Sequence, residues 1–137
     1  MNQDCFPPQV RSFVGDGIFK VVAEVKIIGD DLMISVWGGT KPHIGSISVS
    51  VPRPGLQDNT TMSATSSIIN LIGHKDEVVA RKFSEQLAAK FNRNAIATAG
   101  VHIDDITENQ INILMQNMTD LCRDIMIKLE EIIKCKS

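Results

Sequence analysis

The 137-residue sequence contains few aromatic residues and few cysteines. One tryptophan, five phenylalanines and no tyrosine make a strong aromatic stacking site difficult to build within one protomer. Cys5, Cys122 and Cys135 are odd in number and lack the spacing of metal ligands. They argue against a disulfide framework and against a cysteine metal site, so we interpret them as ordinary thiols.

The sequence also lacks a strong excess of charge of either sign. Fourteen basic and 16 acidic residues are mixed along the chain and give a net charge of −2. We therefore expect no basic surface for nucleic acid or for an anionic membrane. Residues 1–10 have neither the basic start nor the apolar run of a signal peptide. Together these absences predict a cytoplasmic protein that binds neither nucleic acid nor membrane.

Common catalytic motifs are missing as well. The sequence has no Gly-x-Ser-x-Gly elbow, no phosphate-loop motif and no Gly-x-Gly-x-x-Gly. It shows no pairing of a histidine with a reactive-looking cysteine. These absences favour a binding protein over an enzyme.

Alternation of apolar and polar residues predicts the strands. They cover residues 19–28, 32–37, 43–51, 61–72 and 95–103. In the third of these, Ile47, Val49 and Val51 share one face of the strand and three serines share the other. The serine face could simply be exposed to solvent. We expect this strand to end at Pro52, because proline has no N–H to donate to a sheet.

Two helices are predicted, over residues 75–92 and 107–136, from apolar residues that recur every three or four positions. The second begins with a capping box of Thr107 and Gln110, and Ile106 and Ile111 form the matching hydrophobic staple. This start is the best-defined boundary in the sequence.

The order β-β-β-β-α-β-α predicts an α+β fold in which two helices cover one face of an antiparallel sheet of about five strands. Residues 1–137 fit a single domain, with residues 1–16 as an extended N-terminal arm. The apolar strands of so small a protein leave sheet surface to be covered, so we also expect a homodimer.

This topology brings residues with distinctive chemistry to one end of the sheet. The second strand ends there and the third begins there, and the fourth strand and the strand over residues 95–103 both run toward it. The residues placed at this rim are Trp37, Lys41, His43, Gly73, His74, Lys75, His102 and Asp104.

The histidines and Trp37 have structural as well as functional explanations. A histidine beside glycine or proline is commonly a turn residue or a cap, and a tryptophan is commonly part of the core. At the end of a strand, however, Trp37 could present its ring for stacking. His43, His74 and His102 could also hold zinc or iron, which would indicate a small metal-dependent enzyme.

The glycines have two interpretations too. Gly38 and Gly39 either form a flexible turn or allow the backbone to approach a ligand closely. The segment Gly73-His74-Lys75 is either a plain helix start or an anion site, because free N–H groups and the helix dipole favour an anion there.

Four segments carry a resemblance to known proteins: WGGTKPHIG at residues 37–45, VPRP at 51–54, GHKDEVVAR at 73–81 and AGVHID at 99–104. They resemble the LpdD-like prenylated flavin chaperones, which accompany gallate decarboxylases, and the proteasome assembly chaperone 4-like proteins. The resemblance extends from about residue 17 to residue 107.

This resemblance implies a chaperone that holds prenylated flavin mononucleotide (prenylated FMN) for a UbiD-like decarboxylase of the gallate or hydroxybenzoate type. It implies that residues 73–75 take the phosphate, that Trp37 with Gly38 and Gly39 flanks the ring system, and that the histidines contact its polar edge. Lys41 belongs to the same predicted site. A cofactor-free protein assembly chaperone is the alternative, because a shared fold does not carry function.

Overall fold

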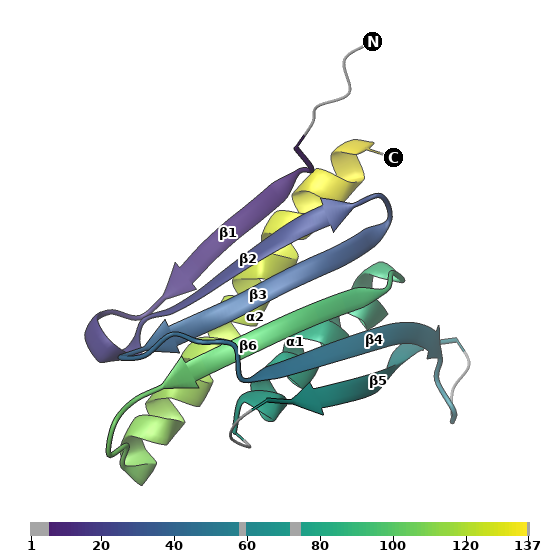
Figure 1. The fold of residues 1–137 in the computed structure, drawn as a ribbon. Helices are drawn as coiled ribbons and strands as arrows, with labels where there is room; N and C mark the ends of the chain where they lie inside the picture. The colour runs from purple at the N-terminus through teal and green to yellow at the C-terminus, as the bar shows by residue number, and fades with distance from the viewer. Residues whose placement is uncertain (1–5, 58–59, 72–74, 137) are drawn as a thin grey trace.

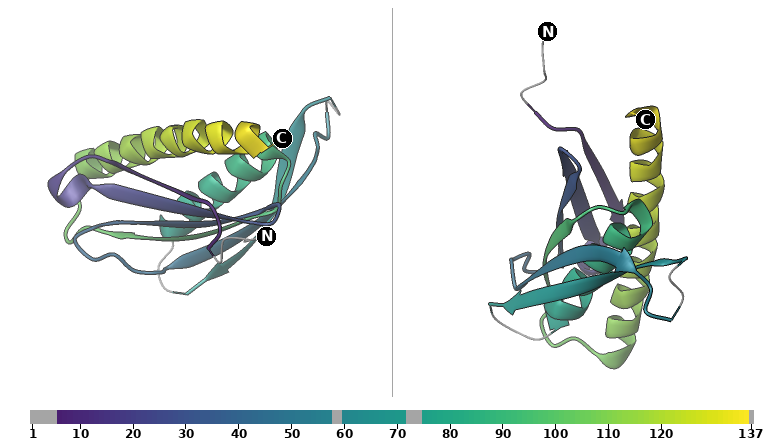
Figure 2. Two further views of the ribbon diagram at one scale, coloured as in Figure 1. Left: turned by 90° about the horizontal axis from the view of Figure 1, so that it is seen from above. Right: turned by 90° about the vertical axis from the view of Figure 1, so that its right-hand side faces the viewer.

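The structure, a computed structural model, describes residues 6–57, 60–71 and 75–136 of the chain. In this part, a twisted sheet carries both helices on one face and leaves its other face bare (Figure 1). Figure 2 shows the same two layers from above and from the side. The predicted α+β class, with two helices on one face, is confirmed.

The elements follow one another as β1 (Gln9–Val14), the 3-10 turn η1 (Gly17–Phe19), β2 (Val21–Ile28), β3 (Asp31–Gly39), β4 (Ser46–Pro54), β5 (Met62–Asn70), α1 (Lys75–Phe91), β6 (Ala95–His102) and α2 (Glu108–Lys136). The spatial order of the strands is β1-β2-β3-β6-β4-β5. All neighbours are antiparallel except β3 and β6, which run parallel.

The sheet differs from the prediction in two respects. Within the described residues it has six strands, because residues 9–14 of the predicted N-terminal arm pair along β2. It is mixed, because β6 returns from α1 into the gap between β3 and β4 and pairs with both. On either side of this gap, β2 with β3 and β4 with β5 form antiparallel pairs, as the predicted antiparallel sheet requires.

The predicted bounds of the third strand were wrong at both ends. This strand, β4, begins at Ser46, so His43 lies in the connecting loop. It continues through Pro52 to Pro54, where its only partner within the described residues is β5, because its last pair with β6 is Ser50 with Ala95. Proline is tolerated where one side of a strand has no neighbour.

The helix ends agree with the sequence. The N–H of Thr107 donates to Oε1 of Gln110 at 2.9 Å, and the N–H of Gln110 donates to Oγ1 of Thr107 at 3.2 Å. This is the reciprocal capping box that the sequence predicts. Asn92 has φ +53°, the left-handed conformation that commonly follows the last turn of a helix.

The core lies between the sheet and the two helices. α2 packs on β1 and β2, and α1 packs on β4, β5 and β6. The largest fully buried side chains include Phe83 and Leu87 of α1, Leu121 and Ile125 of α2, and Ile34 of β3. None of the helices described is both long enough and apolar enough to span a membrane.

Candidate functional site

One rim of the sheet gathers the ends of three strands. β3 and β6 run parallel in a register that pairs Gly39 with His102, and β4 begins beside Ala99 of β6. The N–H of Thr40 donates to the carbonyl of His102 at 2.7 Å, which ties the chain leaving β3 to the end of β6. Because α1 and α2 follow β5 and β6, both helices begin at this rim (Figure 1).

The loop between β3 and β4 crosses closely over β6. A Cβ on Gly100 would overlap the carbonyl of His43, and the N–H of Gly45 donates to the carbonyl of Ala99 at 2.9 Å. Gly39 has φ +79°, and a Cβ there would overlap the carbonyl of His102. Gly38 packs against β2. In this structure the two predicted glycines therefore allow one backbone segment to pack on another.

Asp76, in the first turn of α1, joins three segments of the rim. It is only 6% exposed, and its Oδ1 accepts the N–H of Val101 at 3.0 Å. Its Oδ2 lies 2.9 Å from Nε2 of His43, whose Nδ1 lies 2.9 Å from the carbonyl of Lys41. Both ring nitrogens of His43 therefore face an oxygen atom, which fixes the orientation of the imidazole.

Asp104 makes a second, exposed cluster with His102 and Lys41. Its Oδ1 lies 2.9 Å from Nε2 of His102 and 3.3 Å from Nζ of Lys41. The hydrogen bond from His102, followed by that from Lys41, holds the pKa of Asp104 below its ordinary value of 3.8. The carboxylate is therefore ionised at neutral pH and fixes the position of both side chains.

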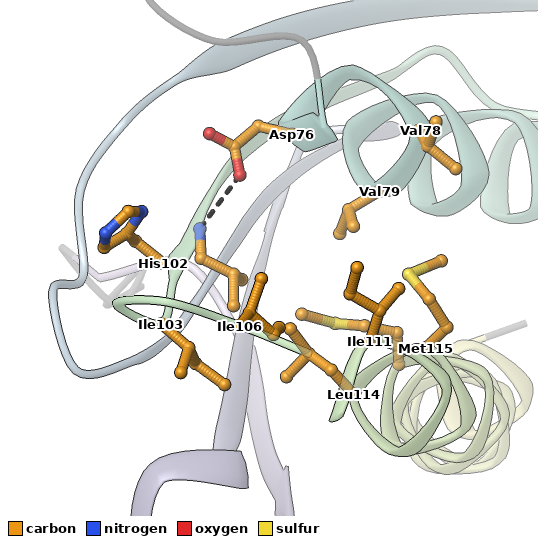
Figure 3. A pocket seen from close by; sticks show the side chains of 11 residues that line it. Asp76, Val78, Val79, His102, Ile103, Ile106, Ile111, Leu114 and Met115 are labelled. Atoms are coloured by element: carbon orange, nitrogen blue, oxygen red, sulfur yellow. Dashed lines mark hydrogen bonds between the residues drawn. The ribbon is translucent and has the colours of Figure 1, made fainter. Parts of the chain in front are cut away.

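A cavity of about 410 Å³ opens beside these clusters, between the first turns of the two helices and the end of β6 (Figure 3). Its wall is almost entirely aliphatic. α1 contributes Asp76, Val78 and Val79; β6 and the loop after it contribute Val101, His102, Ile103 and Ile106; α2 contributes Ile111, Leu114, Met115 and Met118. In Figure 3, Asp76 and His102 lie on the opposite side from Ile111 and Met115 of α2. Such a site can hold a ligand with an apolar body and a polar end.

The structure distributes the predicted site residues over the two faces of the sheet. His102 lines the cavity. His43 does not line it but contacts Asp76, which does. Trp37 alternates with the buried residues Ile34 and Val36 along β3, so its half-buried ring lies on the face away from the helices and the cavity.

Part of the prediction falls outside the described structure. Gly73 and His74 are not among the described residues, and Lys75 is described only as the first residue of α1. The predicted metal site of His43, His74 and His102 includes His74, so it also lies partly outside the described residues. Among the residues that are described, no three His, Cys, Asp or Glu side chains are grouped to hold a metal.

The apolar wall of the cavity was not predicted from the sequence. Val78, Leu114 and Met115 occupy helical positions that are typical of a core, so their spacing cannot separate a ligand site from packing. The one available signal was the predicted staple of Ile106 and Ile111. Both residues line the cavity, which places the start of α2 at the site.

Comparisons with known protein sequences give two results. The family model for the prenylated flavin chaperone LpdD-like domain matches residues 15–130. The Protein LpdD of Lactiplantibacillus plantarum is 29% identical over 114 residues, which are 82% of this chain and 79% of that protein.

A solved structure is similar in fold. It is a chain of a chaperone complex for yeast 20S proteasome assembly, with a TM-score of 0.57 and 12% sequence identity, covering 90% of this chain and 95% of that one. At this identity the likeness concerns the fold alone.

Proposed function

Because this chain belongs to the prenylated flavin chaperone LpdD-like family, we propose that it binds prenylated FMN in the cavity between α1 and α2 and delivers it to a UbiD-like decarboxylase. The observation that carries the proposal is the aliphatic cavity of about 410 Å³, with polar groups on one side only. This volume falls within the range of about 300–1,000 Å³ that is usual for small-molecule sites.

The cavity residues fit the chemistry of this cofactor. Prenylation adds an apolar ring to the flavin, and the side chains of Ile111, Leu114 and Met115 offer an apolar surface to it. His102 and Asp76 are the polar residues of the cavity wall, which supports contact with the polar edge of the flavin or with its ribityl hydroxyls. When bound, the cofactor supplies the flavin chemistry that the client enzyme uses.

The phosphate of the cofactor has favourable surroundings at the rim. Both helices begin there, and the N-terminal end of a helix attracts an anion through its free N–H groups and its dipole. Lys41, which is exposed and paired with Asp104, supplies the cation of this proposed phosphate site. We also keep the predicted anion site at residues 73–75 as part of this proposal.

Ring stacking by Trp37 is not needed for this binding mode. Its side chain lies on the other face of the sheet, and the described residues of the cavity wall include no phenylalanine, tyrosine or tryptophan. Apolar contact with isoleucine, leucine and methionine side chains takes its place. Methionine suits this task because its flexible thioether adapts to the shape of a ligand.

The proposal describes a binding protein that performs no catalysis. Cys122, the one cysteine whose side chain is described, is buried, and desolvation raises the pKa of its thiol to about 11. It therefore remains protonated and unreactive at neutral pH. We place the protein in the cytoplasm, where such a thiol stays reduced. We also propose that it acts as a homodimer.

Titration with cofactor tests the proposal. Prenylated FMN, and ordinary FMN for comparison, are added under anaerobic conditions, and absorbance and co-elution are followed. Leu114→Trp fills the cavity and is expected to weaken binding at least about 10-fold, a loss of about 1.4 kcal/mol. Ile113→Trp is the matched control, because Ile113 is 46% exposed and does not line the cavity. Met115→Trp replaces Leu114→Trp if that variant does not fold.

Two outcomes contradict the proposal in different ways. If neither flavin co-elutes or shifts its spectrum, the cofactor function is wrong and a cofactor-free assembly chaperone becomes the better explanation. If flavin binds equally well to the Leu114→Trp variant and to the wild-type protein, the cofactor lies elsewhere on the molecule. Thermal unfolding of each variant shows that the comparison is made on folded protein.

A further inference from the structure

Strand β5 forms one edge of the sheet, and within the described residues it pairs only with β4 (Figure 1). Along such a strand, backbone groups that face the neighbouring strand alternate with groups that face outward. The N–H of Leu71 donates to the carbonyl of Gly45 at 2.8 Å, and the N–H of Gly55 donates to the carbonyl of Thr61 at 2.8 Å. These bonds fix which residues of β5 face β4. The residues whose N–H and C=O groups face outward are Met62, Ala64, Ser66, Ile68 and Asn70.

Two other unpaired edges of the described sheet carry groups that hinder a further strand. At the opposite edge, the carbonyl of Arg11 in β1 already accepts a hydrogen bond from Nζ of Lys128 in α2 at 2.9 Å. At the end of β4 that β6 does not reach, Pro52 and Pro54 have no N–H to offer. Charged residues and prolines are the usual protection of an edge strand, and β5 contains neither. The β5 edge is therefore open to a further strand.

Glu85 of α1 places a negative charge beside the middle of this edge. Its Oε1 accepts a hydrogen bond from the hydroxyl of Ser66 at 2.7 Å, so the carboxylate lies at β5 on the helix side of the sheet. Among the described residues, no cation pairs with Glu85. Glu77, which also reaches β5 through Asn70, is paired with Arg81 at 2.8 Å. Glu85 is thus the carboxylate at this edge that a cation of a partner can neutralise.

Arg53 of β4 places a positive charge on the open face, which is the face of the sheet without helices. Its Nε donates to Oγ1 of Thr65 at 2.7 Å, and Thr65 lies on the opposite face from Ser66 because side chains alternate along a strand. A further strand beside β5 therefore meets a carboxylate on the helix side and a guanidinium on the open face. Such an edge favours a segment with a basic residue opposite Ser66 and an acidic or polar residue beside Thr65.

We propose that an extended segment of the client protein adds to β5 as a further strand of the sheet. The alternating N–H and C=O groups of an open edge match an extended main chain, and the charges on either side select its side chains. A second copy of this chain is the poorer occupant. An antiparallel copy of β5 paired about Ser66 would place two Glu85 carboxylates over the same residue pair, and like charges there are destabilising. The inference rests on the proposed function for the identity of the client, a UbiD-like decarboxylase.

Hydrogen exchange at single amides tests the inference. A purified UbiD-like decarboxylase without cofactor is added, and the exchange of each amide is read by nuclear magnetic resonance. The outward amides of Ala64, Ser66 and Ile68 are expected to exchange at least about 10-fold more slowly in the complex. Those of Thr65 and Ser67 already donate to β4 and should change little. Protection that alternates along β5 is the signature of an added strand.

Substitutions at the edge give a matched comparison. Ala64→Pro removes an outward N–H and no bond to β4, and it is expected to weaken decarboxylase binding at least about 10-fold. Phe13→Pro is its control, because the N–H of Phe13 faces outward from the opposite edge. Glu85→Lys should also weaken binding, and Glu131→Lys on α2 is its control. Ile68→Pro replaces Ala64→Pro if that variant does not fold, as circular dichroism shows.

Each result decides the inference separately from the cofactor, because flavin titration measures cofactor binding on its own. Alternating protection, with weak binding by Ala64→Pro and Glu85→Lys and normal binding by their controls, supports the inference even if no flavin binds. A wild-type protein that does not bind the decarboxylase overturns it together with the delivery step. Binding that leaves β5 unprotected and is unaffected by Ala64→Pro overturns the inference alone. A dimer of the free protein that already protects the outward amides overturns it in favour of a second copy.

Discussion

The two helices cover the same face of one sheet with opposite chemistry. Under α2, the inner face of β2 is wholly apolar, with Val21, Ala23 and Val25 at 0% exposure against residues such as Leu121 and Ile125. Under α1, the inner face of β4 is a row of serines that meets Ser84. One half of the sheet is therefore held by apolar burial and the other in part by hydrogen bonds.

Apolar burial and hydroxyl contacts contribute differently to the stability of the sheet and to the register of its strands. Burial of apolar surface contributes about 25 cal/mol per Å², whereas an intramolecular hydrogen bond adds only about 1 kcal/mol net. Hydroxyl contacts are directional, however, and they fix the register of β4. Apolar burial thus holds the β1 and β2 side of the sheet under α2, and the serine contacts under α1 release the apolar residues of β4 to the open face.

The largest effect is expected in the α2 half. Leu121 is 0% exposed, so Leu121→Ala removes apolar contacts and leaves a cavity. We expect the free energy of unfolding to fall by about 3–5 kcal/mol. Urea unfolding followed by circular dichroism, at one fixed protein concentration, measures it. A cost below that of the Ser84 variant described next would contradict the larger contribution of apolar burial.

A smaller effect is expected in the α1 half. Ser84→Ala deprives Ser48 and Ser50 of a shared partner, and buried hydroxyls without partners cost about 1–3 kcal/mol. Replacing all three serines by alanine removes both sides of these contacts. The triple variant should therefore cost less than the sum of the three single variants in the same urea experiment. Simple additivity would contradict a hydroxyl network that acts as a unit.

Much of the fold could be predicted from the sequence because its signals are local. The capping box at Thr107 and the alternation over β2 and β3 need only neighbouring residues to be recognised. β1 was missed because Arg11 and Ser12 interrupt its apolar character, and only pairing with β2 gives it a strand partner. The inward orientation of the serines could not be predicted, because alternation defines two faces without saying which one meets a helix.

The candidate site was predictable only in part for a related reason. Strand directions alone place His43, Lys41 and His102 at one rim, and the structure has them there. The face on which a side chain lies depends on register, so the position of Trp37 away from the cavity could not be foreseen. The cavity itself depends on how far the two helix starts stand apart, which no local pattern encodes.

The smallest effect is expected at the seam between the two halves, where Cys122 of α2 contacts Gln86 of α1. Desolvation by burial raises the pKa of this thiol from 9.0 to about 11, although Lys82 acts in the opposite direction. A raised pKa in the folded state gives a stabilisation that is complete below pH 9.0 and is lost as the pH rises toward 11. At about pH 9.5 the unfolded thiol is largely ionised and the folded one is not, so the loss is on the order of 1 kcal/mol.

Urea unfolding of the wild-type protein and of Cys122→Ala, at about pH 7.5 and about pH 9.5, isolates this contribution. The variant is less stable at both pH values because it loses packing, but its stability should fall less between them. Ionisation of lysines affects both proteins equally and cancels in the difference. Parallel losses would mean that the thiol ionises normally in the folded protein, and hence that water enters the seam and the α2 half is less tightly closed than its buried aliphatic residues indicate.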